Sequence, residues 1–174
     1  MAITNDDILD QILQFEGGPT NDSNDHGGPT NFGITAADFG RFLGLAGPAS
    51  ADQVRNMTRA QALTIFRADY LTGPKFDQII DDTLRLVLVD SGVLFGTGRA
   101  TRWLQQALGT VSVDGGIGDK TLAALTACTD LPKLAREVLS LRFRSIADIV
   151  AGDSTQIRFL RGWVSRAASL LERL

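Results

Sequence analysis

Apolar residues recur through most of the chain at intervals of three and four, the spacing that places side chains on one face of a helix. The first stripe is Ile8, Leu9, Ile12 and Leu13, and Asn5 or Thr4 is placed to cap it. Strict alternation of apolar and polar residues is almost absent. We therefore expect a mainly α fold, with at most a small β-hairpin in or near residues 18–34.

The pattern predicts seven further helices, most of them marked by a start or stop signal such as a capping residue, a glycine or a proline. They run from Thr35 or Ala36 to Gly44, Thr58 to Tyr70, about Ile79 to Phe95, Ala100 to Leu108, Asp119 to Leu125, Pro132 to Val150, and Ser154 or Thr155 to Leu171. The helix at 79–95 is apolar on nearly every side, which predicts burial from several directions.

The segment Gly96-Thr97-Gly98 is the best candidate for a boundary, giving regions 1–96 and 97–174. Three residues are too few to separate independent domains, so we expect the two regions to pack into one body. Within the second region, a tight turn over residues 113–119 is expected to be held by apolar Val113 and Ile117.

Composition is that of a soluble globular protein, with 44% apolar and 21% charged residues among 174. No apolar run is long enough to span a membrane, and the acidic N-terminus lacks the basic and apolar parts of a signal peptide. A single cysteine, Cys128, excludes an internal disulfide and is expected to be a small buried thiol. With one histidine, His26, a zinc site is not expected, and no cofactor is implied.

Charge is divided unevenly along the chain. Residues 1–96 hold 6 basic and 13 acidic side chains, a net −7, whereas residues 97–174 hold 11 and 7, a net +4. The basic second half can attract an anionic polymer such as a bacterial wall, or it can simply be solvated helix faces. No basic cluster is interleaved with aromatic residues, so nucleic acid is not an expected partner.

Candidate chemistry gathers in the glycine-rich stretch from Phe15 to Thr35. Glu16 lies four residues after Ile12 and three after Leu13, so it continues a buried face, where partial desolvation raises a carboxyl pKa as a general acid requires. Only two other glutamates exist, and both lie beside arginines in helical stretches.

Several chemistries do not fit this stretch. A calcium loop needs a bidentate glutamate where Gly33 stands, no phosphate-binding Gly-Lys-Ser/Thr loop is present, and one histidine gives no convincing nucleophile relay. A pair of carboxylates in different environments remains: Glu16 at the end of an apolar face and Asp25 in a polar loop. Such a pair is what glycoside hydrolysis requires, and the Thr30 hydroxyl is placed to hold the attacking water.

The same residues resemble a known family. Glu16-Gly17-Gly18, Asn21 and the run Asp25-His26-Gly27-Gly28-Pro29-Thr30-Asn31-Phe32-Gly33-Ile34-Thr35 are similar to the motif of glycosyl hydrolase family 108 muramidases. That family includes phage endolysins, endolysins of phage-like particles and lysozyme-like secretion activators. Residues 104–122 and Gly162-Trp163-Val164-Ser165-Arg166 resemble the predicted peptidoglycan-binding domain (type 3) that usually follows it.

The resemblance implies a lysozyme-like fold and hydrolysis of the β-1,4 bond between N-acetylmuramic acid and N-acetylglucosamine, with Glu16 as the catalytic glutamate. We expect Asp25 to act as the base of an inverting reaction. The spacing also resembles T4-type lysozymes, whose threonine falls on Asn31, whereas Thr30 is the threonine present here. Substrate contacts are expected from Asn21, His26, Asn31 and Gly33, with a structural hydrogen bond as the alternative for His26.

Two other functions are compatible with the sequence: a lytic transglycosylase, against which Asp25 argues, and a wall-binding module without catalysis, against which the intact Glu16, Asp25 and Thr30 argue. We expect a monomer that acts on glycan strands in the periplasm and does not insert stably into membranes. Without a signal peptide, it would be made in the cytoplasm and released through a phage holin or a specialised export system.

Overall fold

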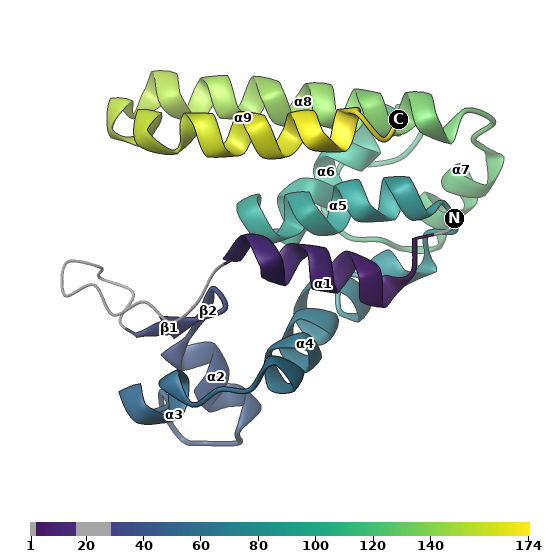
Figure 1. The fold of residues 1–174 in the computed structure, drawn as a ribbon. Helices are drawn as coiled ribbons and strands as arrows, with labels where there is room; N and C mark the ends of the chain where they lie inside the picture. The colour runs from purple at the N-terminus through teal and green to yellow at the C-terminus, as the bar shows by residue number, and fades with distance from the viewer. Residues whose placement is uncertain (1–2, 17–28) are drawn as a thin grey trace. The chain divides into compact units, whose positions relative to one another are not determined.

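A computed structural model of the chain describes residues 3–16 and 29–174. Over these residues the chain is mainly helical and has one antiparallel hairpin of two short strands, which confirms the expected fold class (Figure 1). It forms two compact units: an N-terminal unit, Thr4–Asp69, and a C-terminal unit, Tyr70–Leu174, to which Ile3 also belongs. None of the described helices is long and apolar enough to cross a membrane.

The N-terminal unit has four helices and the hairpin among its described residues. Its apolar core comes from every helix and includes Ile8, Leu9, Val54, Ala62 and Phe66, all at most 2% exposed. The elements are α1 (Asn5–Glu16), β1 (Thr30–Asn31), β2 (Ile34–Thr35), α2 (Ala36–Phe42), α3 (Ala51–Arg55) and α4 (Arg59–Arg67).

The C-terminal unit is built from five α-helices and short helical connections. A π-helical turn, Ala68–Thr72, leads into it, and 3-10 turns lie at Phe76–Gln78 and Ser154–Gln156. The α-helices are α5 (Asp82–Phe95), α6 (Thr97–Leu108), α7 (Asp119–Ala127), α8 (Leu131–Gly152) and α9 (Ile157–Leu171).

Helix α5 is the centre of the C-terminal unit, as its apolar sequence predicts. Leu84, Leu86, Val87 and Leu88 are fully buried, and the helix packs against both α6 and α8. Gly96 joins α5 to α6 with φ 87°, a left-handed conformation that glycine adopts without steric cost. The predicted boundary at residues 96–98 is therefore a tight corner between two packed helices.

A buried ion cluster ties α5, α8 and α9 together. The Asp90 carboxylate accepts from Arg142 Nη1 at 2.7 Å and from Arg166 Nε at 2.6 Å, and Asp90 and Arg142 are at most 1% exposed. Burial lowers the pKa of Arg142, and the facing Asp90 carboxylate opposes that shift. The cluster contains two cations and one anion. The negative charge of Asp90 therefore offsets the cost of removing both guanidinium groups from water, and loss of that charge would leave two buried cations without a counter-ion.

Apolar contacts do not hold the turn before α7 in the way the sequence suggested. Ile117 is buried, but Val113 is 44% exposed. The turn is held by Gln105 of α6, whose Nε2 donates to Asp114 Oδ1 at 2.7 Å and to the Gly116 carbonyl at 2.9 Å, while its Oε1 accepts from the Gly115 N–H at 2.8 Å. A side-chain amide can pair with both donors and acceptors of a loop, which a valine cannot do.

Candidate active site

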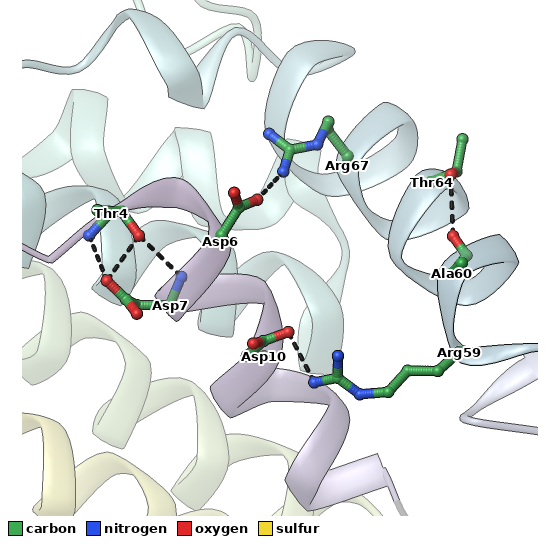
Figure 2. A network of polar contacts seen from close by, with 8 residues as sticks. All are labelled: Thr4, Asp6, Asp7, Asp10, Arg59, Ala60, Thr64 and Arg67. Atoms are coloured by element: carbon green, nitrogen blue, oxygen red, sulfur yellow. Dashed lines mark hydrogen bonds and ion pairs between the residues drawn. The ribbon is translucent and has the colours of Figure 1, made fainter.

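Helix α1, which ends at Glu16, is fixed to α4 by two ion pairs (Figure 2). Asp10 pairs with Arg59 at 2.7 Å, and Asp6 pairs with Arg67. Because the lower-numbered aspartate pairs with the higher-numbered arginine, the two helices run antiparallel. Both pairs are exposed to water and contribute little by themselves, so most of the anchoring energy comes from the buried stripe on α1: Ile8, Leu9, Ile12 and Leu13.

The start of α1 is fixed by a reciprocal cap, also drawn in Figure 2. The Asp7 N–H donates to Thr4 Oγ1 at 3.1 Å, and the Asp7 carboxylate accepts from the Thr4 N–H at 2.9 Å and from its hydroxyl at 2.6 Å. Donation by the Thr4 hydroxyl, followed by its backbone N–H, lowers the pKa of Asp7. Thr4, one of the two expected capping residues, is therefore the cap.

Of the predicted catalytic residues, the structure describes the backbone of Glu16 and all of Thr30. Glu16 is the last residue of α1, as the helical pattern requires. Its side chain lies outside the described part of the chain, and so do Asn21, Asp25 and His26. Both described residues belong to the N-terminal unit.

The hairpin brings Thr30, Asn31 and Gly33 together. Thr30 faces Thr35 and Asn31 faces Ile34 across the two strands. The two turn residues between them, Phe32 and Gly33, both have positive φ, 53° and 73°, as the tightest hairpin turns require. Phenylalanine rarely adopts this conformation, so the turn is locally strained at one of its two central positions.

Asn31 is buried and is held by the end of α3. Its side chain is 3% exposed, and Nδ2 donates to the carbonyl of Val54 at 3.0 Å and to that of Arg55 at 3.4 Å. Its Oδ1 has no hydrogen-bond partner among the described residues. The amide nitrogen of Asn31 is thus committed to positioning the hairpin, whereas Thr30 on the same strand is half-buried.

Two positioning features of this site were not found from the sequence. The bond from Asn31 to α3 spans more than twenty residues, and no local pattern indicates it. Gly40 of α2 is packed so closely that a Cβ there would lie 2.3 Å from the Gly47 carbonyl oxygen, so the loop after α2 can fold back against the helix. A glycine inside an apolar helical stripe is a signal for such close approach.

The described residues contain no group of three or more histidine, cysteine, aspartate or glutamate side chains placed to hold a metal ion. At the candidate site the described residues offer the Thr30 hydroxyl, a group that can position a water molecule.

Comparison with known proteins identifies the family. Residues 9–96 match the glycosyl hydrolase 108 family, and residues 99–168 match a family described as a predicted peptidoglycan domain. A solved structure titled "Structure of Brucella abortus SagA" is similar, with a TM-score of 0.78 and 30% identity over 95% of this chain and 90% of that chain. None of the curated proteins shows significant similarity to the chain. The chain therefore belongs to the glycosyl hydrolase 108 family, and it is a glycoside hydrolase with a C-terminal predicted peptidoglycan-binding region.

Proposed function

We propose that the protein is an endolysin-type N-acetylmuramidase, which hydrolyses the β-1,4 bond between N-acetylmuramic acid and N-acetylglucosamine in peptidoglycan. The observation that carries this proposal is the position of Glu16. It is the last residue of a helix anchored by four buried side chains and two ion pairs, inside the range that matches the glycosidase family. A residue at the end of a rigid helix keeps a fixed position relative to a bound sugar.

In the proposed reaction, Glu16 protonates the glycosidic oxygen as the bond to the leaving sugar breaks. Asp25 removes a proton from water as that water attacks the anomeric carbon from the opposite face, so the configuration inverts. This geometry requires the two carboxyl groups to lie about 6.5–9.5 Å apart.

Thr30 is the residue that we assign to position the water. Asn31, the alternative, is 3% exposed and its Nδ2 already donates to the α3 carbonyls, whereas Thr30 is half-buried. Asn21, His26 and Gly33 are proposed to contact the sugars around the cleaved bond.

The family match to residues 99–168 supports the bacterial cell wall as the place of action. We propose that the C-terminal unit holds the enzyme on the wall while the N-terminal unit cleaves glycan strands. The isolated chain is proposed to act as a monomer.

Mass spectrometry and NMR of fragments released from purified peptidoglycan test this function. We expect fragments ending in a reducing N-acetylmuramic acid, which appears first as the α-anomer. A 1,6-anhydro end would identify a lytic transglycosylase and remove the role given to Asp25. A β-anomer would make Asp25 a nucleophile, and a reducing N-acetylglucosamine end would contradict the assigned bond.

A further inference from the structure

A cavity of about 370 Å³ lies in the C-terminal unit where the ends of α6 and α7 meet the start of α8. The lining includes apolar side chains of three helices, among them Ala107, Leu108, Ala124 and Leu134. Its volume falls at the lower end of the range of small-molecule sites, enough for about one or two amino-acid residues. The whole cavity lies within the range matched to the predicted peptidoglycan domain.

Charges of both signs also line this cavity. Lys133 Nζ and Glu137 Oε1 are 3.9 Å apart and their side chains are 66% and 45% exposed, so the pair is long and accessible to water. Asp130 adds a second carboxylate, of which Oδ1 accepts the Lys133 backbone N–H at 2.9 Å. An exposed ion pair of this length contributes little, so a ligand carrying both charges can replace it at small cost.

These features fit the peptide part of peptidoglycan better than its sugars. The N-acetylated sugars of a glycan strand carry no cation, so they can offer two carboxylates only the hydrogen bonds of neutral hydroxyl and N–H groups, which are weaker than those of an ammonium. The stem peptide contains a diamino acid, whose aliphatic side chain can end in both an ammonium and a carboxylate. The apolar floor of the cavity matches the aliphatic part of such a side chain, and the lysine and two carboxylates at the edge match its two charged groups.

We propose that this cavity binds the stem peptide of peptidoglycan through its diamino acid residue. The aliphatic segment lies on the apolar floor, the ammonium contacts Glu137 and Asp130, and the carboxylate contacts Lys133. The inference rests on the proposed function, since it assumes that peptidoglycan is the substrate. It adds that the C-terminal unit recognises the peptide and selects walls whose diamino acid carries a free side-chain carboxylate.

Cys128 provides the measurement, because it lines the cavity, is half-buried and is the single cysteine of the chain. The full-length protein is alkylated with iodoacetamide in the presence of the tetrapeptide L-Ala-γ-D-Glu-diaminopimelyl-D-Ala, and intact mass gives the rate. Because only unoccupied protein reacts, a peptide concentration about ten times Kd slows alkylation about tenfold. No protection by the tetrapeptide, or equal protection by the disaccharide without peptide, overturns the proposal.

Three variants assign the contacts. Lys133→Met and Glu137→Gln each raise the peptide concentration for half-protection about 3- to 10-fold, the loss of one charge-assisted contact at an exposed site. Lys120→Met, the matched control on α7, lies outside the lining of the cavity and leaves this concentration unchanged. The proposal is overturned if the peptide protects both Lys133→Met and Glu137→Gln at the same concentration as it protects the wild type.

A second peptide tests which charge meets Lys133. Replacing diaminopimelate by lysine removes the side-chain carboxylate and keeps the ammonium, so wild-type protection weakens. With Lys133→Met the two peptides protect equally, because the contact that distinguished them is gone. Unequal protection by the two peptides in that variant contradicts the assignment. None of these peptides contains a glycosidic bond, so the outcome is independent of hydrolysis, which the fragment analysis measures separately.

Discussion

Among the described residues, each unit buries one amide side chain against a loop or helix end, and the two amides differ in how completely they are paired. Gln105 in the C-terminal unit is 1% exposed, and both its nitrogen and its oxygen bind the turn at residues 114–116. Asn31 in the N-terminal unit is 3% exposed and donates to the end of α3, but its oxygen has no partner among the described residues.

The difference distinguishes Gln105, which has a purely structural role, from Asn31, which lies at a candidate site. A fully paired buried amide offsets its own desolvation and fixes one loop conformation. A buried acceptor without a partner costs free energy and is maintained only by the structure around it, a condition that is common near functional sites. In the N-terminal unit, the positive φ of Phe32 and the half-paired Asn31 amide therefore lie next to each other on the hairpin of the candidate site.

The ion pairs of the two units show the same contrast. Asp90 of the C-terminal unit is buried with Arg142 and Arg166, whereas Asp10 of the N-terminal unit pairs with Arg59 at a site where both side chains are about half-exposed. Water screens the exposed Asp10–Arg59 pair, so that pair contributes little to stability. Removing Asp90 from the buried cluster costs much more, because two buried cations lose their counter-ion.

The largest expected effect is on chemistry in the N-terminal unit. Glu16→Gln should lower wall lysis by about 10²- to 10⁴-fold, because it removes the proposed general acid. The melting temperature should stay close to wild type, because glutamine keeps the size and shape of the glutamate side chain at the last residue of α1. Turbidity clearing and thermal unfolding measure the two effects, and lysis within about tenfold of wild type would contradict the assignment.

The next effect tests the buried ion cluster of the C-terminal unit. Asp90→Asn should reduce the free energy of unfolding by about 3–5 kcal/mol, because two buried guanidinium groups lose their carboxylate. Asp10→Asn is the matched control in the N-terminal unit and should cost less than about 1 kcal/mol. Urea unfolding measures both, and equal losses would show that burial does not distinguish the two pairs.

Gln105→Ala tests the fully paired amide. It leaves the Gly115 N–H and the Gly116 carbonyl without their partner, so the free energy of unfolding should fall by about 2–4 kcal/mol. Gln106→Ala, the exposed neighbour on α6, should change stability by less than about 0.5 kcal/mol. A small effect at Gln105 would mean that water replaces the amide without loss.

Asn31→Ala should cost less than Gln105→Ala, about 1–2 kcal/mol, because among the described residues only its nitrogen finds hydrogen-bond partners. Asn56→Ala is the control: its exposed amide donates to the Asp52 carbonyl at 2.9 Å, and water can replace that bond, so the variant should cost less than Asn31→Ala. Denaturant midpoints of the two variants give the comparison. A cost for Asn31→Ala above that of Gln105→Ala would reverse the contrast between the units.

The smallest expected effect is a pH dependence at the Gln105 turn. Donation by the Gly116 N–H and then by Gln105 lowers the pKa of Asp114 in the folded protein below its ordinary value of 3.8. A lowered folded pKa stabilises the protein above that ordinary value, and the stabilisation is lost as the pH falls through the folded pKa. Asp114→Asn should therefore flatten the loss of stability below pH 3.8, which acid titration of the urea midpoint measures.

Sequence alone determined the elements whose signals are local. The Thr58 capping box, the Thr35 cap of α2, the apolar α5 and the end of α1 at Glu16 all follow from residues within one or two turns of each other. The family motif likewise lies within one stretch of about twenty residues, 16–35, so the sequence by itself indicated the glycosidase class. The assigned roles of Glu16, Asp25 and Thr30 stay predictions.

Tertiary structure alone decided the long-range partners. Three sets of hydrogen bonds depend on which elements pack together. They join Asn31 to α3, Asp90 to two arginines more than fifty residues away, and Gln105 to the turn at 114–116. Tertiary structure also opened the cavity beside Cys128, a residue that the sequence predicted to be buried and that is half-exposed. Local patterns record capping and amphipathicity because these act within a few residues, whereas the partner of a buried polar group is fixed only when the chain closes around it.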